Sequence, residues 1–140
     1  MKNLRSVLFV LAAILIAPAA KAQQNGVKAD VPFDLVVGNR AYPAGEYILK
    51  TAVNSNGVTR FENVQEVSIA FIPSNSCEAG KPATQTKLVF HRMGERYFLY
   101  QVWAAGNLTG REFPKGRVEI ELAQIHENPE IVTVAAALTR

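Results

Sequence analysis

Apolar and polar residues alternate along much of the chain with a period of two residues. In the longest such stretch, residues 27–37, one side is apolar throughout and the other carries Lys28, Asp30 and Asp34. A period of two over this length predicts a β-strand with one buried face. Proline cannot donate a hydrogen bond to a neighbouring strand, so Pro32 predicts either an edge strand or a break into two pieces.

Further strands are predicted between turn signals. The pattern predicts strands over 46–53 and 58–64, joined by a hairpin at the Asn-Ser-Asn-Gly sequence of residues 54–57. Another strand is predicted over 67–72. Residues 74–83 are rich in Pro, Gly, Asn and Ser and show no periodicity, which predicts a surface loop.

A second hairpin is predicted from the stretches 84–91 and 96–103, which are rich in branched and aromatic residues. A loop centred on Met93-Gly94 would place on one face the pairs Leu88 with Leu99, Phe90 with Tyr97, and Thr84 with Trp103. The other face would hold the pairs Lys87 with Tyr100, Val89 with Phe98, and His91 with Arg96. We expect the first face to be core and the second to be a solvent-facing binding surface.

The C-terminal third is less regular. Residues 104–116 contain turn signals and predict irregular structure, and residues 131–137 predict a closing strand. The stretch 118–125 fits both a strand and one face of a helix, and its composition favours a helix. About seven strands, with one short helix near residues 115–126, predict an all-β fold, either a small antiparallel sandwich or a barrel.

The N-terminal residues predict an exported protein. A basic start, an apolar run over 7–17 and small residues before Ala22 are typical of a secretory signal peptide over residues 1–22. Cleavage before Gln23 would leave residues 23–140 as a single β-rich domain in the periplasm or outside the cell. The apolar run is too short to cross a bilayer, so we expect no integral membrane span after cleavage.

Charge and cysteine content narrow the choice of partners. The whole chain carries a formal net charge of +3, but three of its basic residues lie in the signal peptide, which leaves equal numbers of basic and acidic residues. Without a basic run, no nucleic-acid partner is predicted. Cys77 is the only cysteine. It predicts either a disulfide-linked dimer or an unpaired thiol in a loop.

The sequence contains no zinc-binding, hydrolase or phosphate-loop motif, so we predict no cofactor, no metal site and no catalytic residue. Each candidate binding residue also has a structural interpretation: an exposed hairpin end, a core aromatic, or a salt bridge or turn contact. An arginine in a loop offers a planar guanidinium for a carboxylate or a sugar. The five candidates are His91, Arg96, Tyr100, Arg111 and Glu112.

Several short strings run through the chain after the signal peptide in a fixed order. They are VPFD and VG within 31–38, PAGEY over 43–47, LVFH, G and YFL within 88–99, and GRE and PK within 110–115. In this order they resemble a group of short exported acidobacterial proteins of unknown function. The chain departs from that group at Tyr42, where leucine is expected, and at Gly116, where serine is expected. The resemblance implies a bacterial envelope location and no particular activity.

These features favour a non-enzymatic exported β-domain that binds an envelope component or a partner protein. The alternative is a small periplasmic or secreted hydrolase that acts on envelope sugars or peptides. A hydrolase would require a deep pocket that holds two titratable groups.

Overall fold

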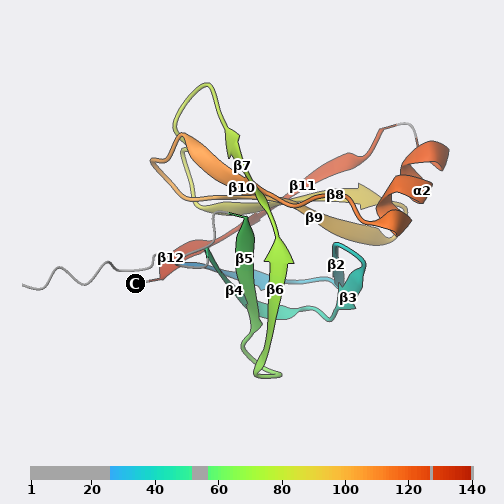
Figure 1. The fold of residues 1–140 in the computed structure, drawn as a ribbon, viewed down its shortest axis with the longest axis horizontal. Helices are drawn as coiled ribbons and strands as arrows, with labels where there is room; N and C mark the ends of the chain where they lie inside the picture. The colour runs from blue at the N-terminus through green and yellow to red at the C-terminus, as the bar shows by residue number, and fades with distance from the viewer. Residues whose placement is uncertain (1–25, 52–56, 127, 140) are drawn as a thin grey trace, which may run out of the picture.

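The computed structural model describes residues 26–51, 57–126 and 128–139. Their strands form two sheets that pack face to face, accompanied by one short helix (Figure 1). This arrangement confirms the predicted small β-sandwich, and the two sheets do not close into a barrel. The predicted signal peptide and its cleavage site at Ala22 and Gln23 lie outside the described residues.

One sheet, sheet A, has five strands that are all antiparallel to their neighbours. In spatial order they are β12 (Ala137–Thr139), β1 (Gly26–Val31), β4 (Gly45–Thr51), β5 (Val58–Asn63) and β6 (Ser68–Pro73). The pairing of β4 with β5 confirms the first predicted hairpin. Most of its turn, residues 52–56, lies outside the described residues.

The other sheet, sheet B, has seven strands. Five follow the order β11 (Glu130–Ala135), β8 (Lys87–Met93), β9 (Arg96–Trp103), β10 (Thr109–Glu112) and β7 (Asn75–Glu78). The remaining two form a small hairpin, β2 (Leu35–Val37) and β3 (Arg40–Tyr42), in which β2 also pairs with β9 in parallel.

The chain changes sheets inside stretches whose alternation predicts a single strand. The stretch 27–37 breaks at Pro32, so that β1 belongs to sheet A and β2 to sheet B. This confirms the second of the two roles predicted for that proline. The stretch 131–137 breaks at Ala136, which separates β11 of sheet B from β12 of sheet A. Such breaks help to divide the described residues into twelve short strands.

Two stretches predicted to be irregular contain strands, and these two predictions were wrong. Residues 74–83 include β7, and residues 104–116 include β10. The two strands pair with each other, with Cys77 opposite Gly110. Neither strand shows hydrophobic alternation, so the sequence pattern could not reveal them. Backbone pairing with strands that are distant in the sequence stabilises both.

The second predicted hairpin is confirmed, but its predicted register was wrong. β8 and β9 are joined by Gly94-Glu95, with Gly94 at a φ of 62°, which suits the first central position of a tight turn. The register then shifts at Tyr100, which forms a bulge because Phe90 opposes Leu99 while Val89 opposes Gln101. The other altered pairs are Arg92 with Tyr97, Leu88 with Val102, and Lys87 with Trp103.

The core lies between the inner faces of the two sheets. Leu88, Phe90 and Leu99 are buried there, as predicted. Across from them, the rings of Tyr47 and Phe61 stack with their centroids 4.7 Å apart. Burying side chains of this size contributes about 1.5–3 kcal/mol each to the free energy of unfolding.

The ambiguous stretch near residues 115–126 forms helix α2 (Arg117–Ile125). It begins after Gly116, whose backbone lies so close to the β2–β3 turn that an added Cβ would be 1.9 Å from the carbonyl oxygen of Gly38. The side-chain oxygen of Asn39 accepts a hydrogen bond from the backbone of Arg117 at 2.8 Å, which satisfies one of the free N–H groups of the first turn. Contacts with a distant turn therefore fix where the helix begins.

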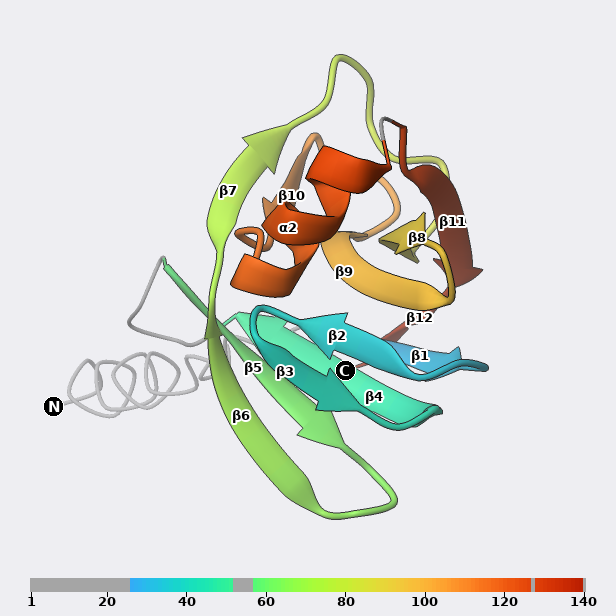
Figure 2. The same ribbon diagram turned by 90° about the vertical axis from the view of Figure 1, so that its right-hand side faces the viewer.

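Helix α2 lies at the hairpin end of sheet B, in front of β9 and β10 when the molecule is viewed from that end (Figure 2). Within the described part of the chain, no helix is long and apolar enough to span a membrane.

Candidate functional site

Two of the five predicted site residues meet on the outer face of sheet B, on the side of helix α2. The ring of His91 stacks on that of Tyr100, with centroids 4.0 Å apart and an angle of 26° between the planes. Helix α2 adds Glu119, whose Oε1 lies 3.4 Å from His91 Nδ1. Glu119 was not among the residues predicted from the sequence, because its contact with His91 depends on the distant backbone contacts that position α2.

Two members of this cluster, His91 and Glu119, are almost completely buried, and Tyr100 is half-buried. His91 is 8% exposed and Glu119 is 4% exposed, so the expectation that His91 faces solvent was wrong. Burial raises the pKa of Glu119, and the hydrogen bond and charge of His91 only partly oppose this effect. Burial, together with the carboxylate of Glu112, also raises the pKa of Tyr100. The contact between Glu119 and His91 attaches α2 to the sheet.

Glu112 belongs to the same outer face. Its Oε2 accepts a hydrogen bond from Gln101 Nε2 at 3.0 Å, and Gln101 Oε1 in turn accepts one from Trp103 Nε1 at 3.0 Å. Gln101 and Trp103 were not among the predicted site residues. The bulge at Tyr100 turns Gln101 to this face, and a sequence pattern that assumes regular alternation cannot reveal that change.

The remaining two predicted residues lie elsewhere. Arg96 is exposed at the hairpin end of β9. Arg111 points to the inner side of sheet B, where its Nη2 donates a hydrogen bond to the carbonyl oxygen of Ser74 at 2.7 Å. The hydroxyl of Ser74 is also 2.8 Å from that of Thr59. Arg111 therefore holds the point where the chain passes from β6 to β7. This contact is structural, as in the alternative interpretation of Arg111 as a residue with a salt bridge or turn contact.

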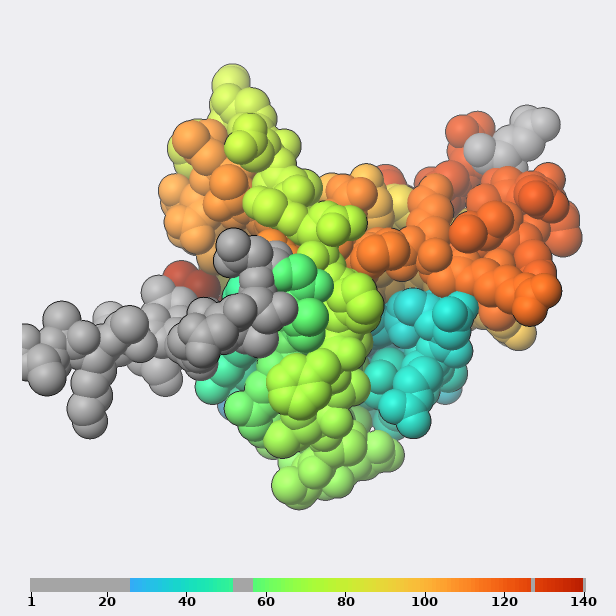
Figure 3. Space-filling view, viewed as in Figure 1, coloured from blue at the N-terminus to red at the C-terminus, as the bar shows by residue number. Residues whose placement is uncertain are grey.

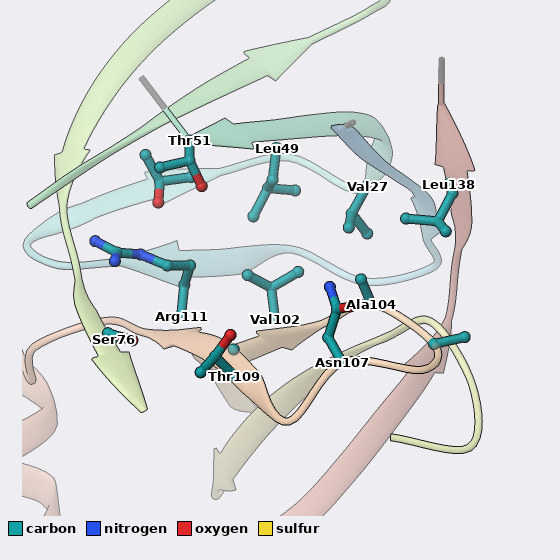
Figure 4. Close-up of a pocket in the computed structure, with 13 residues that line it drawn as sticks. Val27, Leu49, Thr51, Ser76, Val102, Ala104, Asn107, Thr109, Arg111 and Leu138 are labelled. Atoms are coloured by element: carbon teal, nitrogen blue, oxygen red, sulfur yellow. The ribbon is translucent and has the colours of Figure 1, made fainter. Parts of the chain in front are cut away.

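A cavity of about 460 Å³ lies between the two sheets beside Arg111 (Figure 4). Its volume falls within the range of small-ligand pockets. Val27 and Leu49 come from sheet A, and Val102 faces them from sheet B. Among the described residues that line it, Arg111 is the only charged one, and it donates hydrogen bonds to the hydroxyl and carbonyl oxygens of Ser74.

A larger groove, of about 640 Å³, runs between β6 and the β2–β3 hairpin. These elements form two of its walls (Figure 3), and residues 114–116 form a third. Five consecutive residues of β6, from Ile69 to Pro73, line it. Because successive side chains of a strand point to opposite faces, a row of consecutive residues means that the groove follows the backbone edge.

Strand β6 is an edge strand that is apolar on both faces. It pairs with β5 on one side, and no strand within the described residues pairs with its other side. Ala70 and Ile72 point toward the core, whereas Ile69 and Phe71 point outward, where Phe71 is 65% exposed. Edge strands of soluble proteins usually carry charges, bulges or covering elements that prevent pairing with other chains. β6 has no lysine or other charged residue in its sequence.

The residue before β6 is also unusual. Val67 has a φ of 51° and is 83% exposed. A β-branched side chain is rarely found in this left-handed region, where glycine or asparagine is expected. Strained backbone of this kind occurs preferentially at functional sites. It leaves an exposed apolar side chain directly before β6.

Cys77 is half-buried in β7, which corrects its predicted loop position, and burial raises the pKa of its thiol. These observations give no support to a Cys77-linked dimer. Within the described residues, no group of three or more His, Cys, Asp or Glu side chains is placed to hold a metal ion.

Comparisons with protein-family models, with curated proteins and with solved structures found no match to this chain.

Proposed function

We propose that this chain is an exported, non-enzymatic domain of the bacterial envelope that binds a partner protein. In this proposal a strand of the partner pairs with the free edge of β6. The observation that carries the proposal is the free edge of β6, which is apolar on both faces and borders a groove along its backbone. The signal-peptide pattern at residues 1–22 and the resemblance to exported acidobacterial proteins support the location.

Strand addition suits this edge for two physical reasons. The backbone N–H and C=O groups on the unpaired side of an edge strand can form the same hydrogen bonds with a partner strand as with a neighbour in the sheet. The exposed side chains of Ile69 and Phe71 would be removed from water by that partner, and burial of apolar area is the main favourable contribution to most protein association.

The hydrolase alternative has less support. Hydrolysis would need two titratable groups that open onto a deep pocket. The close pair His91 and Glu119 is buried on the side of helix α2 and lines neither the inter-sheet cavity nor the groove beside β6. The groove instead offers apolar side chains and backbone, which are typical of a peptide-binding surface.

Site-specific photo-crosslinking in the native host would test the proposal. A photo-reactive residue replacing Phe71 should join the protein to one defined partner, and the crosslinked peptide should map to a single extended segment. The protein recovered from the envelope should begin at Gln23. The matched control is the same replacement at Ile131, which is 59% exposed. Ile131 lies on β11, an edge strand of sheet B.

A crosslink at Phe71 but not at Ile131 would support strand addition to β6. Equal crosslinking at both positions, or none at Phe71, would overturn it. Recovery of the protein from the cytoplasm with Met1 still present would overturn the proposed export.

A further inference from the structure

The charged side chains around the groove beside β6 are unevenly distributed. Among the described residues that line it, the charged ones are Arg40, from β3, and Lys115, from the segment before α2. Both are cationic and exposed, and no ion pair within the described residues involves either of them. Lys115 also exerts a charge effect on the buried Glu119.

The groove continues into a smaller hollow at the other end of β6. That hollow, of about 280 Å³, shares Arg40, Tyr42, Ile69 and Ala70 with the groove and adds Glu66. Arg40 therefore lines both hollows, Lys115 lines only the groove that reaches Pro73, and the acidic Glu66 lines only the hollow near Ser68. A segment lying along the groove would meet this difference in charge along its length.

We infer that the segment added to β6 is an acidic, alternating apolar strand, with a carboxylate facing Arg40 and Lys115. This inference rests on the proposed function and names the chemistry of the partner. Alternate apolar side chains of such a strand would cover Ile69 and Phe71, and its backbone would pair with β6. The guanidinium of Arg40 is suited to bind a carboxylate through two parallel hydrogen bonds.

A second copy of this chain suits the charges of the groove less well than an acidic partner. In two copies paired through β6 around a two-fold axis, the Ser68 end of one strand would lie beside the Pro73 end of the other. Each copy would then present one acidic side chain, Glu66, toward the two cations Arg40 and Lys115 of its neighbour. A partner with more than one carboxylate matches both cations.

Selection from a displayed library of random short peptides would test the inference, with the mature protein as bait. The wild-type protein should enrich sequences in which apolar residues alternate and Asp or Glu is over-represented. A synthetic peptide of that consensus should bind about three- to tenfold more tightly than its Glu→Gln counterpart, as expected for one or two exposed charge pairs. High salt should reduce this difference.

Two variants provide the controls. Arg40→Glu should reverse the preference, so that Lys or Arg replaces the acidic residues in the enriched peptides. Arg96→Glu makes the same change of charge at an exposed hairpin end outside the groove, and should leave the enrichment as in the wild type. Phe71→Lys should abolish enrichment altogether, because it places a charge in the apolar part of the groove.

The possible results separate the two proposals. Enrichment of alternating apolar peptides without an acidic preference, or with one that Arg40→Glu does not change, would overturn the acidic partner and leave strand addition standing. Failure to enrich any peptide, or enrichment that survives Phe71→Lys, would overturn both. Sedimentation showing a dimer that Phe71→Lys dissociates would identify a second copy as the occupant and would also overturn the inference.

Discussion

An outward-facing phenylalanine of sheet B and one of strand β6 in sheet A have opposite surroundings. Phe98 points outward from sheet B and is 1% exposed, whereas Phe71 points outward from sheet A and is 65% exposed. Over sheet B the chain returns with helix α2, which places Glu119 against His91 next to Phe98. Within the described residues, no corresponding element covers β6.

The comparison shows that apolar composition does not by itself make a strand part of the core. Whether an outward-facing aromatic side chain is buried depends on an element that comes from elsewhere in the chain. Helix α2 is positioned by close contact between Gly116 and Gly38, which lies in the β2–β3 turn. The uncovered β6 is therefore a property of the topology, and it leaves that strand available to another chain.

Replacing each of these two phenylalanines by alanine should give the largest contrast. Phe98→Ala would leave a cavity beneath the covered face and should lower the free energy of unfolding by about 3–5 kcal/mol. Phe71→Ala removes a solvent-exposed ring and should change it by no more than about 0.5 kcal/mol. Chemical denaturation of the two variants measures both effects. Equal losses of stability would mean that β6 is covered in solution, and that Phe71 and Phe98 do not differ in burial as described.

Gly116→Ser should have an intermediate effect, because it displaces the helix on the covered side. The new Cβ would collide with the carbonyl of Gly38, so α2 or the β2–β3 turn must shift, at a cost of about 1–3 kcal/mol. Gly80→Ser is the matched control, since nothing lies within 4 Å of its added Cβ. Thermal unfolding should distinguish the two variants. A Gly116→Ser protein as stable as the wild type would show that this contact does not fix α2.

The smallest effect is expected from Glu119→Gln and should depend on pH. Burial raises the pKa of Glu119 in the folded protein above its unfolded value, so ionisation of this side chain destabilises the fold as the pH rises through the folded pKa. Glutamine retains an acceptor for His91 but cannot ionise. The variant should therefore be more stable than the wild type at neutral and alkaline pH, and the difference should shrink as the pH falls.

Denaturation midpoints of both proteins across this pH range would check the prediction. A difference that does not change with pH would show that the charge of Glu119 costs nothing, and a wild type that is more stable at alkaline pH would reverse the sign.

Alternation and turn signals were sufficient to predict the β class, both hairpins and the inward face of Leu88, Phe90 and Leu99. They were not sufficient for the register, because the turn is Gly94-Glu95 and is not centred on Met93-Gly94, and because a bulge at Tyr100 adds a residue that strict alternation does not contain. They also could not show that residues 27–37 and 131–137 divide between two sheets, since each half keeps its period of two on either side of the break.

The candidate sites were predictable to a lesser degree. His91, Tyr100 and Glu112 were identified and do lie on one face, but Glu119, Gln101 and Trp103 were missed. Arg111 was identified, and its contact with Ser74 spans 37 residues, a distance at which single-sequence patterns carry no information. The apolar character of residues 67–72 is visible in the sequence. Its position at an edge depends on the strand order, which only the fold supplies.

The pairing of β1 with β12 has a consequence for how the chain acquires its structure. Val27 and Leu138 are partners, so the first and last described strands of sheet A are neighbours. Because the chain is synthesised from its N-terminus onward, β1 keeps an unpaired edge until the residues around Leu138 have been made. Contacts of such long sequence separation form slowly, because a large loop must close before they contribute any stability. Sheet A therefore reaches its final form only after nearly all of the described chain has been synthesised.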